Sequence, residues 1–408
     1  MNAHNGMTTT DYDIITVGGG LGGASLAKAM AERGYRVLVL EREEQFKDRV
    51  RGEIMFPWGV AEAQSLGIYD VLMEKCGHLP QFIDTRVGSG SLGLRDLAET
   101  TPQKLRPLCF YHPSMQEALL EAAEDAGAEV RRGARVRGAQ PGTAPTVTVA
   151  SKGGHETLTA RLVVGADGRG SKVRKWGAFD VAADARGLQL AGMLLDNIEG
   201  IEDRSVMVLN PFVQRLALLF PQGGGRARAY FGNRQDSGLR LSGDRDVPKF
   251  IEESIKSGGP ADLYESATQA GPLATFPCIY EWVEHPYRDG VALVGDAATT
   301  SDQTWGQGLS LTVGATRRLR DALVENDDWD KAGHAFAAEV SAMWTPIRTL
   351  EFWFTEMFMA ASEEANALRS RALPLLAQDP TRLPDHFNSG PDVSPIDETA
   401  RRRFFGEE

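Results

Sequence analysis

Three glycine-containing motifs hold most of the residues in this sequence whose types and spacing could do chemistry. Residues 17–23 read Val-Gly-Gly-Gly-Leu-Gly-Gly, and residues 164–170 read Val-Gly-Ala-Asp-Gly-Arg-Gly. Residues 294–310 begin with Val-Gly-Asp-Ala-Ala and end with Gly-Gln-Gly-Leu-Ser. Glycine turns let a backbone approach a phosphate closely, and the first motif matches the turn that holds a dinucleotide pyrophosphate. The chemistry indicated is therefore that of a bound nucleotide cofactor.

The first motif satisfies the pattern G-x-G-x-x-G with Gly18, Gly20 and Gly23. Residues 12–17 are rich in β-branched side chains and predict a buried strand, and residues 24–33 predict the helix that follows. Gly18 would permit the tight turn, Gly20 would let the backbone approach a pyrophosphate, and Gly23 would let helix and strand pack closely. The free N–H groups at the helix start favour an anion there.

An acidic residue ends the next predicted strand, residues 35–42. Glu41 lies 18 residues after Gly23, which is close to the offset of roughly 20 residues expected of the acid that binds an adenosine ribose. A carboxylate suits a free 2′-hydroxyl and repels a 2′-phosphate, so FAD or NAD is favoured over NADP at this site. The neighbouring residues Leu21 and Arg42 are assigned to the same dinucleotide site.

Taken in order along the chain, the three motifs resemble those of the single-component (class A) flavoprotein monooxygenases, the para-hydroxybenzoate hydroxylase-like family. The resemblance implies FAD as cofactor and NAD(P)H as co-substrate. It also implies an α/β fold, in which a Rossmann-like FAD-binding domain of the GR2 type carries an inserted antiparallel substrate domain and C-terminal helices. In addition, residues 309–323 predict a helix whose N-terminal N–H groups would stabilise negative charge on a reduced flavin.

The resemblance also implies roles for individual residues. Asp167 would hydrogen-bond ribose or backbone where FAD meets the nicotinamide cofactor, and Asp296 would bond the ribityl chain. Arg51 stands where the family keeps an arginine near the FAD phosphates. The cofactor-binding residues that we predict are Gly18, Gly20, Leu21, Gly23, Glu41, Arg42, Arg51, His112, Gln116, Val136, Asp167, Asp296, Gly306, Gly308 and Leu309.

Two of these residues open a predicted helix that runs to about residue 126. The family often has Arg and Gln at this helix start, whereas here His112 replaces the Arg and Gln116 is kept. An alternative for His112 is a helix N-terminal residue with no ligand. Val136 ends the predicted strand 128–136, at a position whose backbone usually meets adenine in the family.

The third motif departs from the family pattern on the side of the flavin that faces substrate. Relatives often have His, two prolines, Gly and Asn at five positions that are here Thr299, Asp302, Gln303, Trp305 and Ser310. We therefore expect FAD binding to be little affected and the substrate pocket to be reshaped. Trp305 could stack on an aromatic substrate, or it could be a packing residue. Gln303 and His285 are further pocket candidates, although His285 before a proline also fits a surface loop.

Composition narrows the remaining classes of function. The net charge of −12 disfavours nucleic acid as a partner. Three cysteines without C-x-x-C spacing indicate a reducing compartment and no disulfide, and the scattered histidines indicate no metal site. No apolar run reaches the roughly 18 residues of a membrane span, and the polar N-terminus lacks a signal sequence, so a cytoplasmic location is expected.

The motifs also divide the chain into expected domains. Strand candidates between the second and third motifs predict an antiparallel sheet over the flavin: 187–196, 204–209, 214–220, 226–232 and 274–282. The expected domains are a discontinuous FAD-binding domain (11–80, 105–180 and 286–326), a substrate domain (81–104 and 181–285), a C-terminal helical segment (327–373) and a surface tail (374–408) in which residues 404–405 could dock.

The family resemblance implies an enzyme that hydroxylates an aromatic or other hydrophobic small molecule with NAD(P)H and O2, via a flavin C4a-hydroperoxide. It assigns no indispensable catalytic acid or base. An FAD-dependent reductase or dehydrogenase without oxygen insertion and a non-catalytic flavin-binding protein remain as alternatives. A flavin halogenase is disfavoured, because no two of the seven tryptophans are two residues apart. The substrate, the choice between NADH and NADPH, and the oligomeric state stay open.

Overall fold

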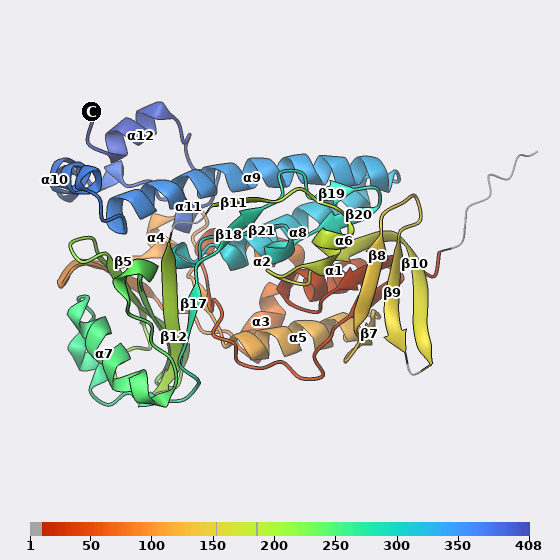
Figure 1. Ribbon diagram of the computed structural model, residues 1–408, viewed down its shortest axis with the longest axis horizontal. Coiled ribbons are helices and arrows are strands. Elements are labelled where there is room, and N and C mark those ends of the chain that lie inside the picture. Colours follow the sequence, from red (N-terminus) through yellow and green to blue (C-terminus); the bar gives the residue numbers. More distant parts are fainter. Residues whose placement is uncertain (1–9, 152, 185–186) are drawn as a thin grey trace, which may run out of the picture.

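Two large sheets and a set of long helices make up the protein (Figure 1). The computed structural model describes residues 10–151, 153–184 and 187–408. Within this part of the chain, no helix is both long and apolar enough to cross a membrane.

The first large sheet is parallel over most of its width. Its strand order is β19-β20-β10-β1-β2-β7, in which β10, β1, β2, β7 and β20 run parallel and β19 closes one edge in the antiparallel direction. Both faces of the central strands are buried, which explains their continuous apolar sequences. The bounds are β1 Tyr12–Val17, β2 Val37–Leu40, β7 Glu129–Arg131, β10 Gly154–Gly165, β19 Tyr287–Arg288 and β20 Val291–Leu293.

Helices connect and cover these strands. α1 follows β1 and contacts α5 and α8, while α2 contacts α8. A Cβ atom on Gly23 would clash with the carbonyl oxygen of Gly18, so α1 can approach β1 this closely only with glycine at that position. The bounds are α1 Leu21–Ala31, α2 Pro57–Leu66, α3 Tyr69–Lys75, α4 Leu97–Thr100, α5 His112–Asp125, α6 Lys172–Trp176 and α8 Gly308–Glu325.

The long strand β10 pairs with two different strands, one along each half of its length. The first half of β10 pairs antiparallel with β9, and its second half pairs parallel with β1. β10 therefore carries the chain from a small meander, β8 (Val136–Gln140) and β9 (Thr146–Ser151), directly into the second glycine motif. The short strands elsewhere are β3 Ile54–Met55, β6 Leu108–Cys109, β11 Ala182–Asp184, β18 Tyr280–Trp282 and β21 Thr299–Thr300.

The second large sheet is built from the residues between the second and third motifs together with the β4–β5 hairpin. Its order is β16-β12-β15-β14-β13-β4-β5, with β17 also paired to β12, and every pairing except β13 with β4 is antiparallel. The bounds are β4 Phe82–Val87, β5 Gly90–Asp96, β12 Leu188–Asp196, β13 Arg204–Asn210, β14 Arg215–Gly223, β15 Arg226–Arg234, β16 Thr268–Gln269 and β17 Ala274–Pro277.

The two faces of this sheet bury different sets of side chains, as the alternation of a strand requires. One face packs against α7 (Val247–Lys256) through a separate core that includes Met193, Val208 and Phe231. Their neighbours in sequence point the other way, toward the first sheet. Figure 1 shows α7 on the outer side of the sheet.

The predicted strand 274–282 is divided between two sheets. β17 ends at Pro277 and pairs with β12, whereas β18 starts at Tyr280 and pairs with β11 and β21. The Cys278 N–H still donates to the Leu188 carbonyl oxygen at 2.9 Å, so the contact with β12 extends one residue past Pro277 before the chain enters the other sheet.

The C-terminal segment is more ordered than its composition suggested. α9 (Trp329–Phe358) runs along the body, and α10 (Glu363–Gln378) follows it. In the segment expected to be a surface tail, the residues after 378 form α11 (His386–Ser389) and α12 (Glu398–Phe404). Phe404 and Phe405 are buried against Trp353, with ring centroids 6.1 Å apart in both pairs. Burial of these rings offsets the entropy of ordering a polar segment.

Candidate functional site

A cavity of about 720 Å³ lies between the two large sheets. All the predicted cofactor-binding residues line it except Gly23, whose place is the contact between α1 and the turn after β1. We call the side formed by the glycine motifs the motif wall; its members include Gly18, Gly20, Asp167, Asp296 and Gly308.

The turn after β1 is shaped for an anion. Gly18 has φ +105°, and a Cβ atom there would clash with the carbonyl oxygen of Ala166. α1 then starts at Leu21; among the described residues, no side chain caps it, and its first turn holds no acidic residue. The N–H groups of this helix start therefore face the cavity without a partner from the protein, which fits the pyrophosphate of a dinucleotide.

Glu41 is held at the end of β2 by two backbone donors. Its Oε2 accepts a hydrogen bond from the Gly19 N–H at 2.7 Å, and its Oε1 accepts one from the Glu43 N–H at 2.9 Å. These bonds fix the carboxylate beside the glycine turn, and each oxygen retains a lone pair for a ribose hydroxyl.

Asp296 and Arg51 face each other across the cavity. The Arg51 Nη1 lies 4.0 Å from the Asp296 Oδ2. Burial raises the pKa of Asp296, and burial likewise lowers the pKa of Arg51. Among the described residues, no hydrogen-bond donor is placed on the Asp296 carboxylate. An acceptor that lines a cavity without a donor fits a ligand rich in hydroxyl groups, such as a ribityl chain.

The Asp167 carboxylate is bonded to three donors of the residues that follow it. It accepts hydrogen bonds from Ser171 Oγ at 2.5 Å, Lys172 N at 2.7 Å and Val173 N at 3.2 Å. The two N–H groups are free donors at the start of α6, so Asp167 fixes the turn of the second motif while it lines the cavity. Of the two roles that the sequence left open for Asp167, the backbone role is the one present here.

His112 opens α5 beside the loop that carries Arg51. Its Nδ1 lies 3.0 Å from the Gly52 carbonyl oxygen, and its backbone N–H donates to Glu53 Oε1 at 2.9 Å. Burial, with a smaller contribution from the nearby Arg51, lowers the pKa of His112 to about 4. The imidazole is thus neutral at pH 7. Gln116 lies one turn further, next to Gly20.

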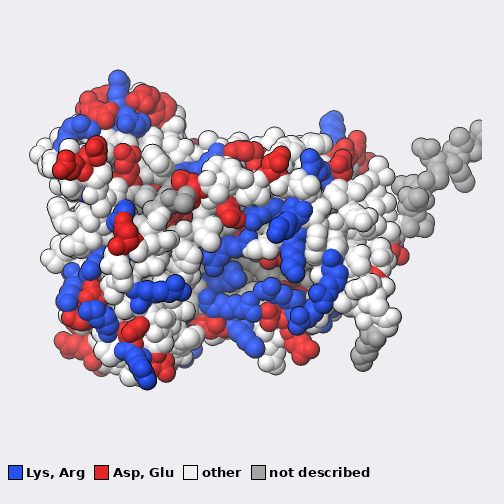
Figure 2. All heavy atoms as spheres, viewed as in Figure 1, with Lys and Arg blue, Asp and Glu red and all other residues white. Residues whose placement is uncertain are grey.

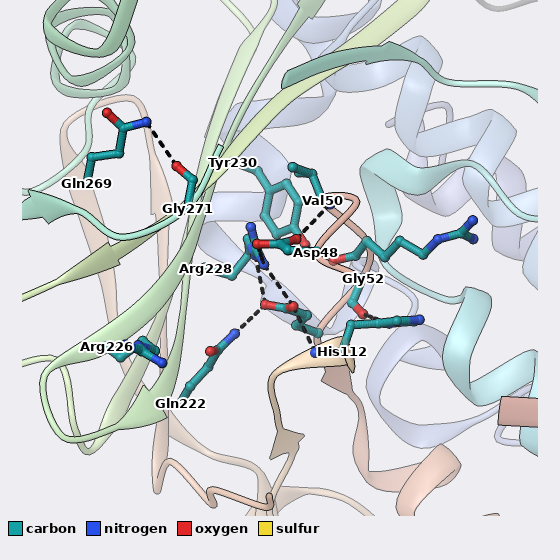
Figure 3. A network of polar contacts seen from close by, with 12 residues as sticks. Asp48, Val50, Gly52, His112, Gln222, Arg226, Arg228, Tyr230, Gln269 and Gly271 are labelled. Atoms are coloured by element: carbon teal, nitrogen blue, oxygen red, sulfur yellow. Dashed lines mark hydrogen bonds and ion pairs between the residues drawn. The ribbon is translucent and has the colours of Figure 1, made fainter. Parts of the chain in front are cut away.

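Sequence reasoning missed a buried charge network behind this loop (Figure 3). Arg228 of β15 binds Glu53 with both Nε and Nη2, at 2.8 and 3.0 Å, and its Nη2 also lies 2.9 Å from Asp48 Oδ2. Gln222 donates to the same Glu53 carboxylate. Arg228 and Glu53 are 0% exposed. The network joins the second sheet to residues 48–53. In the sequence, the one indication of it was an arginine among the apolar residues of the strand that became β15.

The same loop is held from the sheet side by packing. The Tyr230 hydroxyl donates to the Arg51 carbonyl oxygen. Val50 has φ +51°, an unfavourable value for a β-branched residue, and it packs where Gly192 leaves room: a Cβ atom on Gly192 would lie 2.5 Å from Val50 Cγ1. The position of Arg51 therefore depends on residues that are distant in sequence.

The second sheet forms the opposite side of the cavity, which we call the sheet wall. Its six members come from the face that points away from α7, and all of them are uncharged: Leu190, Met207, Leu218, Phe220, Tyr230 and Phe276. The polar end of Tyr230 is already bonded to Arg51. No motif marked these residues, because each one looks like an ordinary strand residue.

The third-motif loop closes the cavity between the two walls. Trp305 lines it but is 3% exposed, donates from Nε1 to Thr355 at 3.0 Å and stacks on Phe387 with centroids 6.0 Å apart. These contacts place Trp305 in a packing role. Gln303 also lines the cavity, and its Nε2 donates to the Ser301 carbonyl oxygen at 2.9 Å.

His285 is not part of this cavity. Its Nε2 lies 2.8 Å from Nδ1 of His334 on α9, and the two rings stack at 5.1 Å. The pocket role proposed for His285 is thus corrected. Pro286 leads straight into β19, which carries the side chain to the side of the first sheet that α9 covers.

Fold and site define an FAD-dependent oxidoreductase. Residues 11–326 match the family described as FAD binding domain, and the chain belongs to this family. The predicted family, the α/β fold class and the FAD cofactor are confirmed, and NAD(P)H is the electron donor typical of the family.

Three known proteins show the range of similarity. Rifampicin monooxygenase from Streptomyces venezuelae is 28% identical over 90% of this chain and 72% of its own. A digeranylgeranylglycerophospholipid reductase from Methanosphaerula palustris is 27% identical over 74% of this chain and 73% of its own. The crystal structure of p-nitrophenol 4-monooxygenase PnpA from Pseudomonas putida DLL-E4 superposes with a TM-score of 0.75 at 21% identity, covering 90% of this chain and 94% of that one.

Proposed function

We propose that the chain is an FAD-dependent monooxygenase that uses NAD(P)H and O2 to hydroxylate a neutral aromatic or other hydrophobic small molecule. The observation that carries the substrate class is the uncharged sheet wall, which faces the motif wall across one cavity. An apolar surface of this kind binds aromatic and aliphatic molecules by excluding water, and its own side chains offer a carboxylate no partner. Arg169 also lines the cavity, with its guanidinium 5.6 Å from the centre of the Phe276 ring.

In this proposal the motif wall binds the cofactor and the sheet wall binds the substrate. Flavin chemistry supplies the hydride acceptance and the oxygen activation. The chain supplies the position: Glu41 and the start of α1 hold the adenosine half, and Asp296 and the start of α8 hold the other half. The sheet wall orients the substrate and keeps water away from the reacting atoms. No side chain is proposed as a general acid or base.

Relatives of both kinds match most of the chain. Proteins named as monooxygenases match 90%, 88% and 90% of it, which supports oxygenation. Digeranylgeranylglycerophospholipid reductases match 74% and 88%. The reductases give specific support to a second candidate, an FAD-dependent reductase that acts on a hydrophobic substrate without oxygen. The same sheet wall would serve that substrate.

Anaerobic reduction of the purified holoenzyme separates these functions. NADPH and NADH are mixed with the enzyme in a stopped-flow instrument, alone and with matched pairs of neutral and carboxylated aromatics, such as naphthol and hydroxynaphthoate. We expect a neutral member to accelerate flavin bleaching at least about tenfold, which corresponds to roughly 1.4 kcal/mol of activation free energy.

Oxygen is then admitted and the products are identified. An oxygenated product supports the monooxygenase, and a hydrogenated product without oxygen supports the reductase. Flavin that no donor bleaches, with any ligand in the panel, would contradict both functions and favour a protein that only binds flavin. Stimulation by the carboxylated members alone would contradict the assignment of a neutral substrate.

A further inference from the structure

Lysine and arginine side chains gather around the hollow that opens in the middle of one face of the molecule (Figure 2). Six exposed cations line the mouth of the cavity, and we call them the cationic rim: Arg42, Lys47, Arg49, Arg135, Arg137 and Lys172. The chain as a whole is acidic, with a net charge of −12. The rim is therefore a local reversal of charge at the entrance of the site.

Most of the rim is free of compensating charge. Arg42 and Arg49 share one carboxylate, that of Glu43, at 3.2 and 2.7 Å. Lys47, Arg135, Arg137 and Lys172 have no ion pair among the residues that the structure describes. What distinguishes these four cations is their position, because they stand around one opening together with Arg42 and Arg49 and, among the described residues, only the carboxylate of Glu43 is paired with the rim.

The rim cations come from three separate parts of the fold. Arg42, Lys47 and Arg49 follow β2, Arg135 and Arg137 lie at the start of β8, and Lys172 starts α6. They thus surround the entrance instead of lying along a single element. A cleft edged by charges of one sign concentrates the field and attracts ligands of opposite charge to its opening.

We infer that the cationic rim binds the 2′-phosphate of an incoming dinucleotide, so that the protein uses NADPH in preference to NADH. The inference rests on the proposed function, in which NAD(P)H reduces the flavin. NADPH and NADH differ only in this phosphate, and guanidinium and ammonium groups are the side chains that bind phosphate best.

The rim and the ribose site at Glu41 favour opposite charges on the ligand. The Glu41 carboxylate lies at the end of β2 and would repel a 2′-phosphate, which suits the FAD adenosine. The rim begins at the very next residue, Arg42, and extends outward to side chains that are exposed. Arg42 belongs to both regions, since the family resemblance also assigns it to FAD, and Arg135 and Arg137 flank Val136 of the FAD site. The exposed side chains extend outward from this shared edge, where a second, 2′-phosphorylated ribose can be bound.

The test is the equilibrium binding of nucleotides that cannot reduce flavin. The FAD-loaded enzyme is titrated with NADP⁺ and NAD⁺, and with adenosine 2′,5′-bisphosphate and 5′-AMP, while the flavin spectrum or the heat of binding is recorded. We expect each 2′-phosphorylated member to bind at least about tenfold more tightly, a difference of roughly 1.4 kcal/mol. This preference should shrink as NaCl rises from 50 to 300 mM, because exposed charges are screened.

Two double variants that remove the same charge test whether the preference for NADP⁺ comes from the cationic rim. The double variant Lys47→Gln, Arg137→Gln should raise the Kd for NADP⁺ about tenfold and change the Kd for NAD⁺ less than threefold. The control Arg240→Gln, Arg245→Gln removes the same charge from exposed positions that do not line the cavity, and should change neither Kd by more than twofold.

The outcomes separate the inference from the proposed function. Equal binding of NADP⁺ and NAD⁺, or an equal loss of both in the rim variant, would overturn the 2′-phosphate site. If NADPH and NADH also bleached the flavin equally well, the monooxygenase proposal would survive without the rim. A weak response to both nucleotides, with no bleaching by either reduced form, would overturn both.

Discussion

The motif wall and the sheet wall of the cavity differ in how their residues are arranged along the chain. In the first two motifs a strand, a glycine turn and a helix start follow one another directly, so local sequence determines the shape of these parts of the motif wall. In the third motif, the short strand β21 and two single turns lie between β20 and the start of α8. The sheet wall instead collects single apolar residues from strands between Leu188 and Pro277. The difference suggests that cofactor identity is encoded locally and substrate choice is encoded by tertiary packing.

The two walls meet at residues 48–53, where Arg228 binds Glu53 and Asp48. The largest effect is therefore expected from Arg228→Met, which leaves two carboxylates without their buried partner. Loss of one member of a buried ion pair costs about 3–5 kcal/mol. Urea unfolding should report a loss of this size in the free energy of unfolding.

A compensating variant tests whether the cost comes from the unpaired charge. In the double variant Arg228→Met, Glu53→Leu, the free energy of unfolding should recover part of the loss, since an apolar pair can replace a buried ion pair at little cost. A single Arg228→Met variant that lost less than about 1 kcal/mol would show that the two walls are not joined in this way.

A smaller effect, confined to the motif wall, is expected from Asp296→Ala. The variant removes the carboxylate that lacks a donor in the protein, and a hydrogen bond to a charged group contributes about 1.5–3 kcal/mol. The Kd for FAD should rise at least about tenfold, and the protein should purify mostly without flavin. Asp397→Ala, at the start of α12, is the control. Full FAD occupancy of purified Asp296→Ala would show that the third motif is placed wrongly.

The sheet wall can be changed without touching the motif wall. Met207 lies between Val206 and Val208, which face α7, so its side chain faces the cavity. Met207→Trp should reduce the space for substrate and abolish most of the ligand-stimulated bleaching, while the Kd for FAD changes less than about threefold. Leu92→Trp, at a position 67% exposed, should leave both unchanged. Unaltered stimulation in Met207→Trp would place the substrate elsewhere.

The smallest effect concerns pH. The pKa of His112 is lowered to about 4 in the folded protein, chiefly by burial, against about 6.5 in an unfolded chain. Between these values the unfolded state binds the extra proton, so His112 contributes stability above pH 6.5 that is lost as pH falls toward 4. The apoprotein should therefore lose less stability between pH 7 and pH 5 when it carries His112→Gln. Parallel losses in the two proteins would contradict this assignment.

What the sequence could predict follows the same division. Gly18, Gly20 and Glu41 were predicted because binding of a pyrophosphate and a ribose demands those residue types at those spacings, whereas Asp296 was predicted from the family resemblance. All four residues line one cavity. Arg228 and the residues of the sheet wall were not predicted. Their roles depend on which face of a strand is buried and on which part of the fold packs against that face. The C-terminal fold also depends on context: the docking of Phe387 on Trp305 needs three distant segments at once.

The most direct test of the whole account is isotope labelling of the product. The enzyme, the neutral aromatic that best stimulates bleaching, and NADPH are supplied with ¹⁸O2, and the product is analysed by mass spectrometry. The account predicts one ¹⁸O atom per product molecule, with the label retained in Leu92→Trp and product formation lost in Met207→Trp. A product without ¹⁸O, formed at the same rate in the absence of oxygen, would contradict the monooxygenase and identify the protein as a reductase.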